Sequence, residues 1–343
     1  MKIIKTMKIQ TLLFCILPAL AVIVGCQSSS PNLRDRNDVM LKIPDIAVPN
    51  TLVAWRSGLE SVSLSESIEK QGVPYGLTNV VAISSCMDHN LALKEDGTVV
   101  AWGDNRWGRC DVPKDLLNVV AVAAGWGYNL ALKKDGTVVM WGYGWDDVMG
   151  VPKKLRDVPE GLCDVVAISA GGYLILALKK DGTVVAWGES GKKLPRSARS
   201  GVVAIKAGLN HHLVLKKNGT VVAWGDNEYG QCKIPRGLSN VVAIEAGVNF
   251  SLALKKDGTV VAWGQKKYGN GQCDVPTGLS DVVAISATVF HSLALKADGT
   301  VVSWPTYGYR SDIPAELSGV TEISAGYNYN FAITTNGAPV LER

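Results

Sequence analysis

The sequence predicts an all-β protein, a seven-bladed β-propeller closed by an N-terminal strand that pairs into the last blade. Three recurring markers lead to this prediction: an apolar four-residue run, an Asp-Gly or Asn-Gly pair, and an apolar run that ends in Trp. A single repeat unit cannot bury its own apolar surface, so a repeat of nearly fixed period belongs to an array of stacked units. The number of markers therefore gives the number of units.

Each marker can be counted separately along the chain. The apolar run is Val-Val-Ala-Ile or a variant of it, beginning at Val80, Val119, Val165, Val202, Val241, Val282 and Val320. The glycine of the second marker is Gly97, Gly136, Gly182, Gly219, Gly258, Gly299 and Gly337. The third marker ends at Trp102, Trp141, Trp187, Trp224, Trp263 and Trp304, and once more at Trp55. The first two counts both give seven units, and successive copies lie 37 to 47 residues apart.

Each unit has the pattern of three short strands. Residues 241–244 are apolar on both faces, which is typical of a strand between neighbouring sheets. Asp257-Gly258 separates two apolar runs and favours a tight hairpin, because both residues tolerate the required backbone conformation. Residues 259–263 form the third strand, and their Trp is expected in the core. A period near 40 residues with three or four strands predicts propeller blades around a central channel.

The two ends of the repeat array predict how the ring closes. The last unit has its first two strands at residues 320–323 and 330–334, but its third, residues 338–341, contains Pro339 and is a poor strand. Residues 51–55 have the pattern of a third strand without a unit of their own. We therefore expect the N-terminal strand to complete the C-terminal blade.

The repeat resembles the regulator of chromosome condensation repeat family, through Ala246-Gly247, residues 252–254, Asp257-Gly258 and residues 262–264. It is most similar to a short-repeat bacterial branch that contains the propeller-type β-lactamase inhibitor protein. The shared phrases are Ala-Leu-Lys, Ala-Trp-Gly-Asp-Asn and Gly-Gln-x-x-Val-Pro, and the resemblance covers residues 51–341. It implies the propeller fold, with inhibition of an enzyme or guanine nucleotide exchange as activities, although one fold hosts many functions.

The N-terminal residues predict export from a bacterial cell. Residues 1–25 combine three lysines with an apolar stretch that lacks acidic residues, the pattern of a signal peptide, and this stretch is too short for a membrane span. The segment ending in Gly25-Cys26 resembles a lipobox, so Cys26 is the predicted lipidation site. The alternative is ordinary signal cleavage with Cys26 incidental. A lipidated Cys26 followed by Gln27 implies an outer membrane lipoprotein, facing the periplasm or the cell surface.

Beyond the leader, the sequence divides into two parts. Residues 26–50 lack periodicity and are predicted to be a flexible tether, and residues 51–343 form the propeller domain. The formal net charge is +4, and three of the positive charges lie in the leader. A nucleic-acid-binding face with clustered basic residues is therefore not expected, and we expect a monomer.

Five cysteines remain outside the leader and the lipobox. Cys110, Cys232 and Cys273 hold the same repeat position. Equivalent positions in adjacent blades should lie roughly 10 Å apart, beyond the ~7 Å Cα limit for a disulfide. Free structural thiols are therefore predicted rather than disulfides, and the cysteine spacing does not match a metal site.

The candidate binding residues lie in the loops that differ most between repeats. Strand direction places the loop after Ala-Gly and the loop after Trp-Gly on the same face. The predicted partner-binding residues of this face are Met87, Asp88, Trp107, Trp126, Tyr143, Trp145, Tyr173, Tyr229, Tyr268, Phe290, Tyr307 and Tyr327. Aromatic residues with scattered charges are typical of protein-binding hot spots. The alternative is that many of these residues only cover their own or a neighbouring blade. We expect half of them to have this packing role alone.

The remaining candidates do not predict catalysis. His89, His211 and His291 share one repeat position and have no carboxylate or nucleophile at a repeated offset, so packing is expected. The Asp-Gly turns lack the alternating acidic ligands of a calcium loop. The sequence thus predicts a non-catalytic binding module without metal or cofactor, whose partner is a protein, with inhibition of an envelope or secreted enzyme as one version. One alternative is a carbohydrate-binding or cell-wall-binding propeller. The other is a guanine nucleotide exchange factor, and the predicted export disfavours this second alternative.

Overall fold

The computed structural model describes residues 50–58, 73–74, 77–142, 157–188, 193–265, 271–305, 310–311, 313–327 and 329–335. The predicted leader, the tether and Cys26 lie outside these residues. Strands dominate the described chain, which also has one turn of 3-10 helix at Arg196–Ala198. None of its helices is long and apolar enough to span a membrane.

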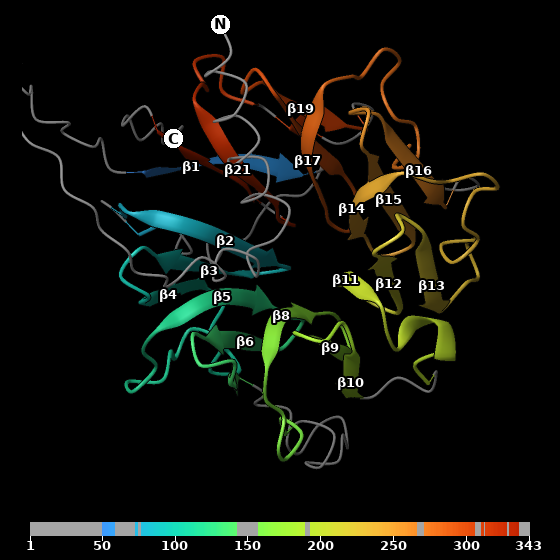
Figure 1. Ribbon diagram of the computed structural model, residues 1–343. Helices are drawn as coiled ribbons and strands as arrows, with labels where there is room; N and C mark the ends of the chain where they lie inside the picture. Colours follow the sequence, from blue (N-terminus) through green and yellow to red (C-terminus); the bar gives the residue numbers. More distant parts are fainter. Residues whose placement is uncertain are drawn as a thin grey trace, which may run out of the picture.

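Seven antiparallel sheets are arranged around a common centre (Figure 1), as the marker count predicts. In the first six blades, three consecutive strands follow one another from the centre outward. Blades 1 and 2 are β2 (Val80–Cys86), β3 (His89–Lys94), β4 (Val99–Gly103), β5 (Val119–Ala124), β6 (Tyr128–Lys133) and β7 (Val138–Gly142). Blades 3 and 4 are β8 (Val165–Ala170), β9 (Leu174–Lys179), β10 (Val184–Gly188), β11 (Val202–Ala207), β12 (His211–Lys216) and β13 (Val221–Gly225). Blades 5 and 6 are β14 (Val241–Ala246), β15 (Phe250–Lys255), β16 (Val260–Gly264), β17 (Val282–Ala287), β18 (Ser292–Lys296) and β19 (Val301–Trp304).

The seventh blade joins the two ends of the chain and confirms the predicted closure. Its strands are β21 (Val320–Ala325), β22 (Tyr329–Thr334), β1 (Thr51–Gly58) and β20 (Arg310–Ser311). β1 runs antiparallel to β22, from the pair Thr51 and Thr334 to the pair Arg56 and Tyr329. The short β20, which no marker in the sequence predicts, pairs with the other edge of β1. The poor strand at residues 338–341 lies outside the described residues.

The apolar core is divided among the seven seams between neighbouring blades. At the seam of blades 3 and 4, Leu174 and Leu176 pack in one cluster with Val202 and Ile205. At the closing seam, Trp102 of blade 1 contacts the edge of Phe331 of blade 7 at a centroid distance of 5.7 Å. The marker tryptophans are all buried, as predicted: Trp55, Trp102, Trp141, Trp187, Trp224, Trp263 and Trp304. Each blade is therefore stabilised by its neighbours rather than by a core of its own.

The residue before each inner strand adopts a left-handed backbone conformation. The φ angles lie between +56° and +65° at Asn79, Asn118, Asp164, Gly201, Asn240, Asp281 and Gly319. Only Asn, Asp and Gly occur there, the residue types that tolerate this region best. The Asp-Gly turns behave as predicted: Gly97 has φ +78°, and Asp96 accepts a 2.9 Å hydrogen bond from the Thr98 amide.

Candidate functional site

The variable loops of each blade meet on one face, which we call the loop face. The amide of Asp104, after β4, donates a 2.7 Å hydrogen bond to the carbonyl of Asp88, between β2 and β3. In blade 4 the amide of Asp226 donates an equivalent 2.8 Å bond to Asn210. The prediction that both kinds of loop share a face is therefore confirmed.

A central channel with a volume of about 650 Å³ is lined by the inner strands of all seven blades. The residues that follow the Ala-Gly position line its end at the loop face, and we call them the collar. The collar consists of Met87, Trp126, Gly172, Leu209, Val248 and Val289. Because these residues are apolar or glycine, this end of the channel has a hydrophobic rim.

Two aromatic pairs, each formed across neighbouring blades, lie at or beside the collar. Trp126 meets Tyr173 edge to face, with centroids 5.3 Å apart and an interplanar angle of 90°. Phe290 and Tyr327 form a tilted pair with centroids 5.5 Å apart. All four residues are half-buried, so each ring both supports its partner and exposes part of its surface. Such packing fixes the orientation of the rings before any ligand arrives.

Trp107 lies farther along the chain of blade 1 and is held by a buried arginine. The guanidinium of Arg109 lies 4.5 Å from the centroid of the Trp107 ring, a cation–π distance. Arg109 is fully buried, pairs with Asp104 at 2.9 Å and donates a 3.1 Å hydrogen bond to the carbonyl of Trp126. Burial opposes ionisation of Asp104, but hydrogen bonds from Arg106 and the charge of Arg109 hold its pKa below the usual value. Arg109 thus connects Trp107 to the collar.

Met87 and Asp88 form the tight turn of blade 1, where β2 extends to Cys86 and pairs with His89. Met87 has φ +46°, an uncommon conformation for a residue with a side chain. Asp88 is half-buried, and this burial raises the pKa of its carboxyl. The turn therefore places a strained apolar residue, Met87, at the mouth of the channel and next to it in the chain an acid with a raised pKa, Asp88.

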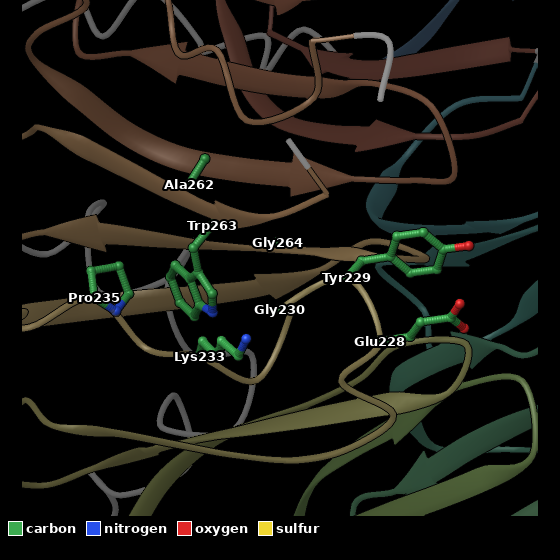
Figure 2. A pocket seen from close by; sticks show the side chains of 8 residues that line it. All are labelled: Glu228, Tyr229, Gly230, Lys233, Pro235, Ala262, Trp263 and Gly264. Atoms are coloured by element: carbon green, nitrogen blue, oxygen red, sulfur yellow. The ribbon is translucent and has the colours of Figure 1, made fainter. Parts of the chain in front are cut away.

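Tyr229 belongs to a separate pocket between blades 4 and 5. This pocket, of about 400 Å³, is lined by Glu228, Tyr229, Gly230, Lys233, Pro235, Ala262, Trp263 and Gly264. Figure 2 shows Trp263 and Pro235 at one side of the pocket and the ring of Tyr229 at the other. The Trp263 indole donates a 2.8 Å hydrogen bond to the Gln231 carbonyl, and Tyr229 is 38% exposed.

The predicted binding residues therefore fall into two zones. Met87, Asp88, Trp126, Tyr173, Phe290 and Tyr327 lie at or beside the collar. Trp107 and Tyr229 lie in the loops that lead from one blade to the next. Tyr143, Trp145, Tyr268 and Tyr307 lie outside the described residues. A role of these residues in binding stays a prediction.

The histidines of the shared repeat position connect blades, which confirms that they pack. The Nε2 atoms of His89 and His291 lie 2.7 and 2.6 Å from the side-chain oxygens of Asn129 and Asn330 in the next blade. His211 contacts Ser251 in the same way at 2.9 Å. All three histidines are fully buried, and burial lowers the pKa of each ring to about 4. They are neutral at physiological pH.

Three charged residues inside the channel were missed by sequence reasoning. Lys206 and Glu245, in neighbouring blades, form an ion pair at 2.6 Å. Glu322, in blade 7, accepts a 3.1 Å hydrogen bond from the amide of Ile83 in blade 1. All three line the channel, and burial raises the pKa of Glu322 to about 7, against the lowering effects of the Ile83 amide and Lys206. Their departure from the repeated Val-Val-Ala-Ile-Ser-Ala pattern was the available signal.

The cysteines of the described chain are thiols rather than disulfides, as predicted: Cys86, Cys110, Cys163, Cys232 and Cys273. Burial raises the pKa of Cys86 to about 12, so this thiol is protonated and unreactive. Among the described residues, no three His, Cys, Asp or Glu side chains are grouped to hold a metal ion.

Together these features define a closed propeller of seven short repeats, with a loop face and a mostly apolar channel that contains Lys206, Glu245 and Glu322 as its candidate binding surfaces. The regulator of chromosome condensation (RCC1) repeat model matches residues 80–108, 119–144, 165–192, 202–231 and 241–270. The chain belongs to the RCC1 repeat family. No curated protein matches it.

Solved structures of similar fold come from fungi, plants and animals. Prp20p of Saccharomyces cerevisiae has a TM-score of 0.64 and 18% identity, over 83% of this chain and 91% of its own. Human WBSCR16 has a TM-score of 0.60 and 14% identity, over 83% of this chain and 98% of its own. The ectodomain of the Physcomitrella patens receptor kinase CR4 has a TM-score of 0.59 and 20% identity, over 72% of this chain and 68% of its own. At these identities the likeness supports the fold.

Proposed function

We propose that this propeller is a non-catalytic module that binds a protein through its loop face. The observation that carries the proposal is the pair of inter-blade aromatic contacts beside the collar, Trp126 with Tyr173 and Phe290 with Tyr327. Half-buried aromatic rings fixed by their neighbours lose little conformational freedom when a partner covers them. Prp20p, which shares the fold, is described with binding properties to Gsp1p and histones, which supports a protein as the ligand class.

The finer version of the proposal is that the protein is exported and lipid-anchored. The signal-like residues 1–25 and the acyl acceptor Cys26 support this version. The partner would then be an envelope or secreted protein, and an enzyme inhibited by occlusion is one concrete form. We do not propose guanine nucleotide exchange, because export would separate the propeller from a cytosolic GTPase.

The test is affinity recovery of partners from envelope extract with the full protein as bait. We expect the double variant Trp126→Ala/Tyr327→Ala to lose the partners that wild type recovers. Lys256→Ala is the matched control, because Lys256 is exposed beside the Asp257-Gly258 turn at the opposite end of its strand. Thermal unfolding of the double variant and of the control variant tests whether each remains folded.

The outcomes separate the alternatives. Equal recovery of every partner by the double variant and by wild type would remove the loop face from the proposal. Loss of recovery with the control variant would point instead to the opposite face, where the Asp-Gly turns lie. A glycan array is run in parallel, and saturable binding to cell-wall or other glycans without a recovered protein would favour the carbohydrate-binding alternative.

A further inference from the structure

Three charges in the channel are not required by the repeat. Lys206 and Glu245 occupy a position that the other blades fill with small side chains: Ser84, Ala123, Ser169, Ser286 and Ser324. Glu322 occupies a position that the other six blades fill with Ala82, Ala121, Ala167, Ala204, Ala243 and Ala284. Because six blades fold with alanine where blade 7 has Glu322, the blade itself does not need this carboxylate.

The carboxylate of Glu322 is only partly satisfied. One oxygen accepts the Ile83 amide at 3.1 Å, and Glu322 forms no ion pair with any residue of the described chain. Glu245, by contrast, has Lys206 at 2.6 Å, and its side chain is only 14% exposed. Removing a carboxylate from water is unfavourable unless a cation or hydrogen-bond donors compensate it. The loss of solvation at the Glu322 carboxylate is therefore not offset by a cation from its own blade.

The three charges share one cavity although they come from different blades. β11, which carries Lys206, and β21, which carries Glu322, lie on opposite sides of the ring (Figure 1). Even so, the charge of Lys206 counteracts the rise that burial causes in the pKa of Glu322. With both glutamates ionised, the three side chains carry one net negative charge. The cavity of about 650 Å³ lies in the size range of small-molecule sites.

We propose that the central channel binds a small organic cation, an ammonium or guanidinium compound, whose charged group pairs with Glu322. A charge-assisted bond from a cationic nitrogen donor to this carboxylate is stronger than a hydrogen bond from a neutral donor. The collar, with Met87, Leu209 and Val248, lines the same channel and offers apolar surface for the aliphatic part of such a ligand. An anion would meet two carboxylates, and the described residues offer no group of three metal ligands. This site is independent of protein binding at the loop face.

Isothermal titration of the full protein tests the proposal with cations and their uncharged isosteres. The probes are arginine beside citrulline, agmatine, putrescine and spermidine. We expect saturable binding of at least one cation, and at least tenfold weaker binding of citrulline than of arginine where arginine binds. If no cation binds below 10 mM, an order-of-magnitude limit for a weak specific site, the proposal is overturned.

Two variants at one position separate binding from folding. Glu322→Ala restores the alanine of the other blades, so we expect an unchanged or higher Tm and at least a tenfold loss of cation affinity. Glu322→Gln keeps the shape of the side chain and should show the same loss. Glu316→Gln, in an exposed loop, is the matched control and should bind as wild type does. Undiminished affinity in Glu322→Ala would overturn the proposal.

The pH dependence gives a second readout. Cation binding favours the ionised carboxylate, so affinity should rise as the pH increases through about 7 in wild type and stay flat in Glu322→Ala. The other titratable groups that line the channel are Lys94, Glu95, Lys206, Glu245 and the thiol of Cys86. These groups are the same in both proteins, so a pH dependence that survives Glu322→Ala would assign the binding to them and overturn the role of Glu322.

Discussion

At the scale of one residue, the repeat position of Arg109 has different side chains in different blades but makes the same backbone contact. The position of Arg109 is held by Gln231 after blade 4, and there the Gln231 amide donates a 3.2 Å hydrogen bond to Asp226. Arg109 makes the corresponding contact with Asp104 as an ion pair. The main-chain oxygens of Arg109 and Gln231 both accept the indole N–H of the next blade's Trp. The backbone contact thus belongs to the scaffold, and the side chain distinguishes the blades.

This comparison predicts two different effects of substitution at Arg109. Arg109→Ala removes the buried cation of Asp104 and leaves only the exposed Arg106 to pair with it, so we expect a loss of about 1–3 kcal/mol in the free energy of unfolding. Arg109→Gln can bond to Asp104 as Gln231 does to Asp226, and we expect less than about half of that loss. Urea unfolding measures both variants. Equal losses would show that the neighbouring repeat is not a guide to this position.

The buried histidines predict a loss of stability in mild acid. The rings of His89, His211 and His291 have an ordinary pKa of 6.5 in the unfolded chain and about 4 in the folded protein, because burial disfavours the charged form. As the pH falls from 6.5 to 4, the unfolded chain takes up protons that the folded protein cannot, so the free energy of unfolding decreases. We expect His211→Gln to have a flatter profile over this range, measured by urea unfolding at each pH. A profile as steep as that of wild type would contradict the assignment.

Glu322 should give the opposite dependence of the free energy of unfolding on pH. Burial raises its pKa from 4.5 to about 7, so its protonated form contributes stability fully below pH 4.5 and loses that contribution as the pH rises through 7. Glu322→Ala should therefore gain stability relative to wild type at pH 8 and little at pH 4. Thermal unfolding of both proteins at the two pH values measures the difference. A larger gain at pH 4 would contradict this sign.

At the scale of elements, the sequence predicts the strands well because each has a strong local pattern. The Asp-Gly turns, the three strands per blade and the orphan strand at residues 51–55 all appear as expected. The inner strands contain a feature that no local pattern shows: the register shifts after the first valine, as between Val80 and Ala82. The same shift recurs in β21, between Val320 and Glu322. A shift of one residue changes which side chains face the channel, and for this reason Glu322 could not be assigned to it from alternation.

We expect the stability of the ring to be sensitive to loss of a buried side chain in the closing strand, β1. Trp55 of β1 is 2% exposed and packs with Leu293, Leu295 and Ile323 at the seam of blades 6 and 7. Trp55→Ala should therefore lower the free energy of unfolding by about 3–5 kcal/mol. Leu117→Ala is the control, because Leu117 is 57% exposed and its loss should stay within about 0.5 kcal/mol. Similar small losses in both variants would show that β1 is not required for closure.

At the scale of the whole molecule, the fold follows from the constant residues, whereas the candidate sites depend on the variable ones. The aromatic loop residues could be named from the sequence, since they differ from blade to blade at fixed positions. Their pairing could not, because Trp126 meets Tyr173 and Phe290 meets Tyr327 only after neighbouring blades have docked. The same holds for the ion pair of Lys206 and Glu245. The two residues are 39 positions apart in the sequence, and the Lys206 Nζ and Glu245 Oε1 atoms lie 2.6 Å apart.

At the scale of the whole molecule, acylation of Cys26 would determine where the protein is held in the cell. If Cys26 is acylated, the full protein should incorporate labelled fatty acid and sediment with membranes, because a lipid anchor supplies apolar burial that the propeller does not need for folding. Cys26→Ser should lose the label and move to the soluble fraction, while its thermal unfolding and its partner recovery through the loop face stay unchanged. Cys163→Ser, an exposed thiol of the propeller, is the control and should keep the label. Label retained in Cys26→Ser would reject the lipidation site, and a soluble wild type with a cleaved leader would favour ordinary signal cleavage.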